Sequence, residues 1–280
     1  MKKLFASLAI FFVVLTIAGC IDVKTKIKVN KDGSGTIEET MFMSSEMVEM
    51  MKQFMSGFGA DSTNTQEFNL YNEEELKNKA SDYGEGVQFL SGKKLEDDGR
   101  EGYAAIYSFA DLNKLKFDQN PDSKIPEGVE AAEPEPKQKE YITFKFDKNN
   151  GSEITINMPS STDENENADS DKDTSMENEN TNSDSLNAGD LSKLKALLKD
   201  FKISLVIETD GEIEETNASY VDKSSVTIFD LNFNLLLDNP EKLAALKKIN
   251  PNDMQELKGI LQDVTGVKIE TSKTIKIKFD

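Results

Sequence analysis

Residues 23–29 read Val23-Lys24-Thr25-Lys26-Ile27-Lys28-Val29, so that lysines alternate with apolar or β-branched residues. An alternation with a period of two is typical of a β-strand that buries one face and wets the other. The next six residues, Asn30-Lys31-Asp32-Gly33-Ser34-Gly35, predict a turn, because glycine adopts positive φ at little cost. Residues 36–43 then return as a second strand. This stretch therefore predicts a β-hairpin with one solvated face.

The strands predicted after this hairpin also come in neighbouring pairs joined by turns. One pair flanks Asp97-Asp98-Gly99-Arg100, and another is joined by a turn at residues 147–151. A helix is predicted from Ser44 or Ser45 to about Phe58, and a second one starts with a capping box formed by Asn72 and Glu75. Strands that pair with their sequence neighbours favour an α+β fold over a doubly wound one. We therefore expect an antiparallel sheet built of hairpins, with helices packed on one face.

An acidic segment interrupts this pattern. Residues 160–187 contain nine acidic residues and one lysine, with only three apolar residues among many Asn and Ser. Such a composition cannot bury enough apolar surface to offset the entropy lost on ordering, which predicts disorder. We expect the chain to divide into an N-terminal α+β part at 20–158, an acidic linker at 159–188 and a C-terminal α+β part at 189–280.

The C-terminal part repeats the mixture of strands and helices. The sequence leaves open whether this part completes one sheet with residues 20–158 or forms a second domain. Its last two predicted strands are expected to close the chain as a hairpin. The predicted strands cover 203–207, 212–216, 225–229, 267–270 and 274–279, and the predicted helices cover 191–198, 241–248 and 252–264.

Composition excludes several functions. The 280-residue chain has 33 basic and 52 acidic residues, a net charge of −19, which argues against nucleic acid and anionic lipid surfaces as partners. It has no His, and so lacks the commonest general base and transition-metal ligand. It has one Cys, which rules out an intramolecular disulfide and a thiolate zinc cage. We therefore expect no catalytic residues, no metal and no cofactor.

The amino terminus is typical of an exported chain. Lys2 and Lys3 precede an apolar run from Leu4 to Ala18, which is too short to span a bilayer comfortably and is followed by Gly19-Cys20. The ending Leu15-Thr16-Ile17-Ala18-Gly19-Cys20 resembles the lipobox of bacterial lipoprotein signal peptides. This resemblance implies that residues 1–19 are removed and that Cys20 carries acyl chains. It places the protein on the exported side of the cell membrane or the outer membrane.

The predicted helix after residue 44 carries an apolar stripe. Its members recur at helical spacing, which is typical of one face of an amphipathic helix. One interpretation is a helix that packs this face on the sheet. The other is an adaptable apolar surface for acyl chains or a partner, because Met side chains repack around varied ligands. The candidate binding residues are Met47, Met50, Met51, Phe54, Met55 and Phe58.

Two segments, one from Cys20 to the Met-rich helix and one between Gly211 and Ile228, together resemble LppM-type bacterial lipoproteins. The first runs from Cys20 through Asn30-Lys31-Asp32-Gly33-Ser34-Gly35 to the Met-rich helix. The second comprises Gly211–Ala218, Val221-Asp222 and Ser225–Ile228. This chain departs from that pattern at Asp210, where the family has Pro, and at Ile228, where Trp is usual. The resemblance covers about a quarter of the chain and implies an α+β envelope domain, without catalytic residues to transfer.

These observations favour a non-enzymatic, membrane-anchored envelope lipoprotein that binds a partner protein or an apolar ligand. Lipidated Cys20 would hold the protein at the membrane. One alternative is a carboxylate-dependent hydrolase that acts on envelope glycans or lipids; it would need two acids positioned in a cleft. Another alternative is a structural spacer at the cell surface.

Overall fold

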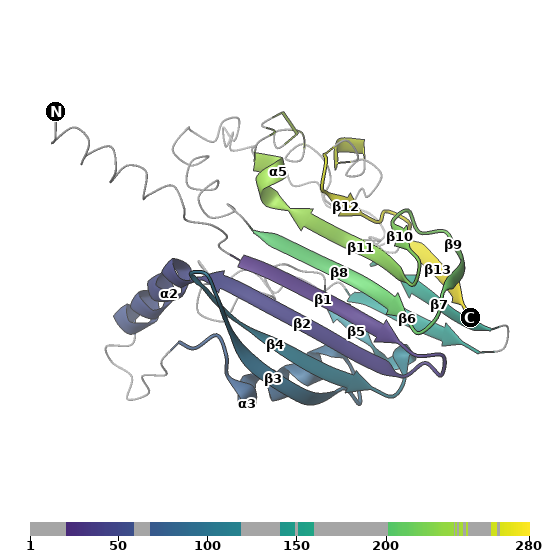
Figure 1. Ribbon diagram of the computed structural model, residues 1–280, viewed down its shortest axis with the longest axis horizontal. Helices are drawn as coiled ribbons and strands as arrows, with labels where there is room; N and C mark the ends of the chain where they lie inside the picture. Colours follow the sequence, from purple (N-terminus) through teal and green to yellow (C-terminus); the bar gives the residue numbers. More distant parts are fainter. Residues whose placement is uncertain are drawn as a thin grey trace, which may run out of the picture.

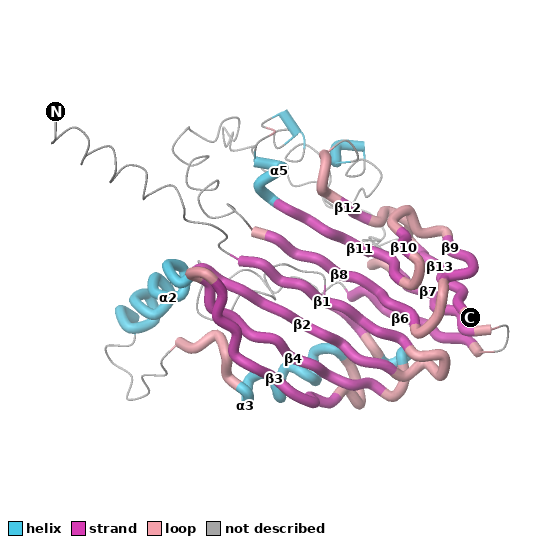
Figure 2. The backbone as a smooth tube through the Cα atoms, viewed as in Figure 1, coloured by secondary structure: helices cyan, strands magenta, loops and turns pink. Residues whose placement is uncertain are grey.

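The structure, a computed structural model, contains two β-sheets and a few short helices (Figures 1 and 2). It describes residues 21–58, 68–118, 141–148, 151–159, 201–237, 239, 241–242, 245, 259–261 and 264–280. The predicted helix at 191–198 lies outside these residues, as do Cys20, the acidic segment and most of the predicted helices at 241–248 and 252–264.

The larger sheet has the strand order β10-β11-β8-β1-β2-β4-β3, and β12 also pairs with β11. The first hairpin lies at its centre, where every residue from Ile21 to Val29 has a partner between Gly35 and Met43. This confirms the strands expected from the alternating lysines. The strands of this sheet are β1 (Ile21–Val29), β2 (Gly35–Ser44), β3 (Gln88–Asp97), β4 (Arg100–Phe109), β8 (Lys202–Thr209), β10 (Val221–Asp222), β11 (Ser225–Asn232) and β12 (Lys268–Ile269).

The smaller sheet has the order β5-β6-β7-β13-β9 and lies behind the larger one in the view of Figure 1. It is antiparallel throughout its described pairs. Its strands are β5 (Lys116–Asp118), β6 (Tyr141–Asp147), β7 (Ser152–Asn157), β9 (Ile213–Thr216) and β13 (Thr274–Phe279). The helical elements are α2 (Ser45–Phe58), α3 (Glu73–Lys79), the 3₁₀ turns η1 (Ala80–Tyr83) and η2 (Leu112–Lys114), and α5 (Phe233–Leu237).

The prediction of an all-antiparallel sheet is wrong at one central pair, because β1 pairs with β8 in parallel, from Asp22↔Lys202 to Val29↔Thr209. Parallel strands need a long crossover between them. Here the whole segment from β2 to residue 201 separates the two strands, so the alternation within β1 does not indicate this partner. Through this pair, strands that precede and follow the acidic segment share the larger sheet.

The predicted closing hairpin is also wrong. β12 pairs with β11 in the larger sheet, whereas β13 pairs with β7 and β9 in the smaller one. The segment between them, from Glu270 to Lys273, therefore crosses from one sheet to the other. Glu270 and Thr271 are buried at this crossing.

One apolar core joins the two sheets. The inward side chains of the first hairpin, such as Ile27 and Ile37, share it with Ile142 of β6 and Ile277 of β13; all four are fully buried. Leu76 of α3 and Tyr83 of η1 are buried in the same core. The turn of the hairpin also meets the second sheet, because the Phe146 ring leaves no room for a Cβ at Gly33, whose φ is +84°.

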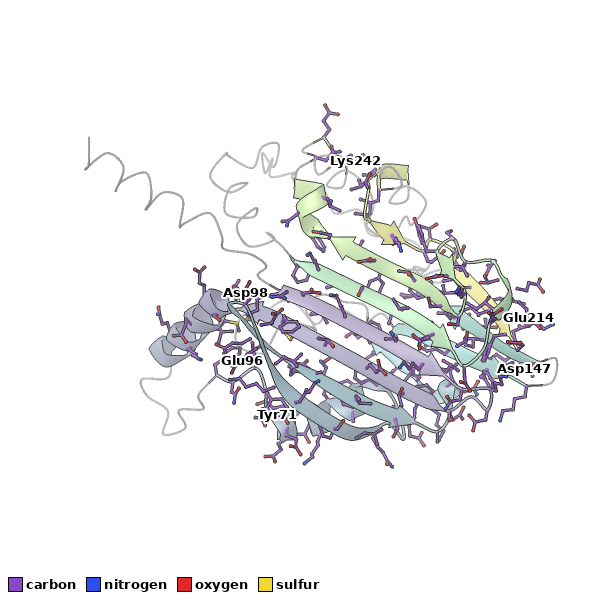
Figure 3. All side chains as sticks on the ribbon, viewed as in Figure 1. Tyr71, Glu96, Asp98, Asp147, Glu214 and Lys242 are labelled. Atoms are coloured by element: carbon purple, nitrogen blue, oxygen red, sulfur yellow. The ribbon has the colours of Figure 1, made fainter. Side chains whose placement is uncertain are left out.

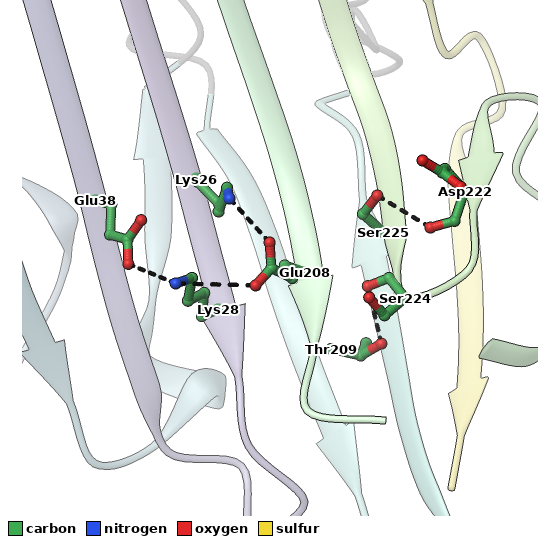
Figure 4. A network of polar contacts seen from close by, with 8 residues as sticks. All are labelled: Lys26, Lys28, Glu38, Glu208, Thr209, Asp222, Ser224 and Ser225. Carbon is green, nitrogen blue, oxygen red and sulfur yellow. Dashed lines mark hydrogen bonds and ion pairs between the residues drawn. The ribbon is translucent and has the colours of Figure 1, made fainter. Parts of the chain in front are cut away.

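The other face of the larger sheet carries a ladder of opposite charges (Figure 4). Lys26 Nζ lies 2.9 Å from a Glu208 carboxylate oxygen, and Lys28 Nζ lies 2.7 Å from Glu38 and 3.9 Å from Glu208. These side chains are between 32% and 41% exposed, so each pair stabilises the sheet by at most about 1 kcal/mol. The lysine face is therefore solvated, as the sequence predicted, and its charges are largely balanced.

Candidate functional site

The end of the larger sheet at which β1 begins brings together several distant segments. Ile21 pairs with Met43, so that Cys20 is the residue immediately before the ladder and Ser44 continues the opposite strand. Ser44 in turn pairs with Arg100, next to the β3–β4 turn. We call this end the anchor-proximal end, after the lipid anchor that the sequence predicts at Cys20. Figure 3 shows Glu96 and Asp98 at this end and Asp147 and Glu214 at the far end.

Helix α2 starts at the anchor-proximal end because Ser44 caps it. The Ser44 hydroxyl accepts the backbone N–H of Met47 at 3.3 Å, which satisfies one of the free donors of the first turn. The backbone N–H of Ser45 donates to the carbonyl of Gly99 at 2.9 Å, which ties the helix start to the β3–β4 turn. From there α2 projects beyond the end of the sheet (Figure 1).

The structure describes the side chains of the first part of the predicted apolar stripe on α2. Met51 is buried in the core, as is Val48, and Met47 is half-buried against it. The first turns of the helix thus use this face for packing, as one of the two interpretations expected. Met50, Phe54, Met55 and Phe58 lie on the α2 backbone, but their side chains fall outside the described residues, so a binding role for them stays a prediction.

The charges around the anchor-proximal end largely pair with one another. Lys24 Nζ lies 3.3 Å from Asp22, and Lys52 Nζ lies 3.0 Å from Glu49 on the exposed side of α2. Arg100 forms an ion pair with Asp97, and its guanidinium lies 4.7 Å from the centre of the Phe42 ring. The described charges at this end therefore neutralise one another in pairs and produce no strong local field.

A second apolar group lies at the same end, around α5. The rings of Phe201 and Phe233 meet edge to face with centroids 5.0 Å apart, and Phe233 N–H donates to the Phe201 carbonyl at 3.0 Å. Leu235 and Leu231 pack against a small separate cluster. The buried members of that cluster are Leu261, Val264 and Val267.

A buried carboxylate forms a second candidate site, which sequence analysis did not identify. Glu39 of β2 is 1% exposed and points into the core. Its Oε1 atom accepts from Lys79 Nζ and from the Tyr103 hydroxyl, both at 2.6 Å, and its Oε2 atom accepts from the Tyr83 hydroxyl. Lys79 also donates to the Tyr103 hydroxyl at 3.1 Å. We call Glu39, Lys79, Tyr83 and Tyr103 the Glu39 cluster.

The Glu39 cluster connects α3 and η1 to the larger sheet. Burial first, and then the neighbouring Glu39 charge, raise the pKa of Tyr83 and Tyr103 well above the ordinary value of 10. Both hydroxyls therefore remain protonated donors at neutral pH. Lys79 is the member that reaches the surface, with 23% of its side chain exposed. A carboxylate held by three donors is suited to fixing the position of α3 rather than to proton transfer with a substrate.

A shallow hollow of about 550 Å³ lies beside η1, but the Glu39 cluster does not line it. Its walls include Lys77, Gly84, Val87 and Lys116. The Tyr107 hydroxyl is buried without a hydrogen-bond partner among the described residues, and it does not line this hollow either. A ligand in this hollow would therefore not contact the Glu39 cluster directly.

Glu270, at the crossing between the two sheets, is a second buried carboxylate that the sequence analysis missed. Its Oε1 atom accepts the backbone N–H groups of Ser219 and Tyr220, and it is 0% exposed. Asn217 fixes the same loop to β13 by donating to the Thr274 carbonyl at 3.0 Å and accepting from Lys276 N–H at 2.7 Å. Polar contacts thus stabilise the loop at residues 217–220, which lies in the second of the two segments that resemble LppM-type lipoproteins.

Within the described ranges, no group of three His, Cys, Asp or Glu side chains is arranged to hold a metal ion. No helix of the described residues is both long and apolar enough to cross a membrane.

Comparison with known proteins gives one distant likeness. No family model matches the chain, and no curated protein matches it. Among solved structures, the chain is similar to the NMR structure of the folded domain of the Mycobacterium tuberculosis LppM protein. The likeness covers 95% of this chain and 94% of that one, at 11% identity and a TM-score of 0.34. At these values no residue of this chain takes a role from that protein.

Proposed function

We propose that this protein is a non-enzymatic lipoprotein of the bacterial cell envelope, anchored through acyl chains on Cys20. In this proposal it binds a partner protein or an apolar ligand at its anchor-proximal end. The observation that carries the proposal is the position of Cys20, which directly precedes β1 in the centre of the larger sheet. A lipid attached there would hold the folded body at the membrane without a spacer.

Lipid anchoring on one residue is physically sufficient. Each buried CH₂ group contributes about 0.8 kcal/mol, and two or three acyl chains give stable attachment where one does not. The lipobox-like ending before Cys20 supports acylation at this residue. The protein would then lie on the exported side of the cell membrane or of the outer membrane.

A binding role is supported by the arrangement around α2. The helix begins beside the anchor, projects past the sheet and continues the apolar sequence periodicity to Phe58. A non-enzymatic role is supported by the absence of His from the sequence and by the engagement of Glu39 with three donors.

Cys20→Ala tests the anchor. We expect the variant to keep its signal peptide or to leave the membrane fraction, whereas Ile21→Val, a matched change on the other side of the cleavage point, should behave as wild type. Membrane fractionation and gel mobility measure both. Unchanged size and membrane attachment of Cys20→Ala would refute the proposal.

The binding role is tested by photo-crosslinking in cells followed by mass spectrometry of both proteins and lipids. A crosslinking residue at Gln53, which is exposed on α2, should capture a reproducible partner, and the same residue at Lys223, at the far end, should not. Met50→Asp and Phe54→Asp should abolish that capture while far-UV circular dichroism remains unchanged. Equal capture from both positions would argue against a binding site on α2.

A further inference from the structure

We infer that the distal half of α2 inserts into the membrane interface, so that the occupant of its apolar side is the lipid bilayer itself. This inference rests on the proposed function, because it requires the body to be anchored at Cys20. It goes beyond that proposal by naming the ligand of the α2 surface and by fixing how the folded body is oriented.

The strand register determines which end of the molecule meets the membrane. Ile21 is the first residue of β1 and pairs with Met43, only one residue away from the Ser44 cap of α2. Acyl chains on the preceding residue would therefore leave the chain next to the strand end from which α2 starts. The same end carries Lys202, which pairs with Asp22 at the start of β8. The far end carries the hairpin turn at residues 30–34 and the β10 strand.

Helix α2 is built to use two different environments along its length. Its first turns bury Val48 and Met51 in the core, which fixes the helix to the sheet. The helix runs outward from the end of the sheet (Figure 1). After Met51 its sequence continues with Phe54, Met55 and Phe58 at apolar helical positions. An amphipathic helix with large apolar residues on one side lies in a membrane interface with that side immersed.

Anchoring makes a small apolar contact sufficient. The described charges near α2 are largely paired, as shown by Lys52 with Glu49 and by Arg100 with Asp97. This described part of the surface therefore has no basic cluster of the kind that draws a free protein to anionic lipid. A segment tethered beside its binding surface experiences an effective concentration on the order of millimolar. A few apolar side chains can then hold α2 at the interface, although they would not recruit an unanchored protein.

The chain offers a clean optical test because it contains no Trp. Phe58→Trp places a single reporter at the end of α2. Val221→Trp is the matched control, since Val221 is a large apolar residue, 44% exposed, on β10 at the far end. Both variants are purified as full-length lipidated protein and reconstituted in phosphatidylcholine vesicles, with or without lipids brominated near the glycerol end of the acyl chains.

We expect brominated lipid to remove about half or more of the Phe58→Trp fluorescence, because an interfacial helix sits ~5–10 Å deep at the headgroup and acyl boundary. The Val221→Trp signal should stay unchanged. Flotation with the vesicles is checked first: a protein that fails to float lacks the anchor, which overturns both the proposed function and this inference. A protein that floats with the vesicles but shows no quenching of the Phe58→Trp fluorescence keeps the anchor and overturns the inference. Contact of α2 that appears only when cellular protein is present would also overturn it and would assign α2 to a protein partner. Phe54→Trp repeats the test if Phe58→Trp does not fold, as judged by circular dichroism.

Discussion

Replacing Glu39 with alanine should be among the most destabilising single changes in this protein. The carboxylate is buried and is the shared acceptor of Lys79, Tyr83 and Tyr103. Removing one partner of a buried ion pair costs about 3–5 kcal/mol, since the remaining groups stay desolvated. Lys79 is 23% exposed and can turn toward water, which reduces its share of the cost. The buried Tyr103 hydroxyl loses its acceptor, a loss of about 1–3 kcal/mol.

A graded series of variants separates the contributions. Glu39→Ala should lose about 3–5 kcal/mol of unfolding free energy, and Tyr103→Phe should lose about 1.5–3 kcal/mol, the value of a hydrogen bond to a charged group. Glu39→Gln keeps the shape and one acceptor oxygen, so it should fall between wild type and Glu39→Ala. Glu38→Ala is the control, because its ion pair with Lys28 is 37–40% exposed and contributes at most about 1 kcal/mol.

Urea titration followed by far-UV circular dichroism measures these free energies. The slope of unfolding free energy against urea concentration should be equal across the series, so that differences in midpoint report stability. A double-mutant cycle between Glu39 and Tyr103 should also give a coupling energy of about 0.5–3 kcal/mol. The reasoning fails if Glu39→Ala costs no more than Glu38→Ala, or if the cycle shows no coupling.

Other changes test the rest of the fold. The pKa values of Tyr83 and Tyr103 are raised, so their stabilising effect is complete below the unfolded pKa of 10 and declines as pH rises above it. Above that pH, the melting temperature of wild type should therefore fall more steeply with pH than that of a variant with both tyrosines changed to Phe. Parallel curves of melting temperature against pH would contradict this. Gly102→Ala should prevent folding, because a Cβ there would lie 1.9 Å from a backbone oxygen of β2, whereas Gly99→Ala, with nothing within 4 Å and a φ of +77°, should cost only about 1–2 kcal/mol. Near-equal urea midpoints for these two glycine variants would be the opposing result. Deleting residues 160–187 should leave the melting temperature nearly unchanged, since a segment of this composition buries little apolar surface. A large drop would show that the segment packs on the body.

Local structure was predictable where short-range chemistry determines it. The lysine alternation of residues 23–29 predicted β1, because a strand exposes every second side chain. The cap at Asn72 was predicted from Glu75, and the structure has Asn72 Oδ1 accepting from the N–H groups of Glu74 and Glu75 while its amide donates to the Glu75 carboxylate at 2.7 Å. In both places the interacting residues are a few positions apart.

Strand partners were not predictable, because pairing depends on the path of the chain beyond the local turn. β1 and β8 are separated by more than half of the chain. Each has the sequence pattern of a half-buried strand, and this pattern does not specify which strand will pair with it. β12 and β13 are adjacent in sequence yet enter different sheets. The buried Glu270 at their junction is bound by backbone N–H groups of a loop some fifty residues earlier, which no local pattern reveals.

The Glu39 cluster left a signal in the sequence that the analysis did not use. In β2 the inward positions are Gly35, Ile37, Glu39, Met41 and Met43, so a carboxylate stands in phase with the core residues. A charge at a core position implies a partner or a network. The identity of the partners, from α3, η1 and β4, still required the three-dimensional structure.

The central claim, that the body is held at the membrane by lipid on Cys20, is tested most directly by mass spectrometry of the amino-terminal peptide of protein extracted from bacterial membranes. The account predicts a chain that begins at Cys20 and carries the added mass of a diacylglycerol group, with or without a further acyl chain on the new amino terminus. A membrane-extracted chain that retains residues 1–19, or that has an unmodified Cys20, would contradict it.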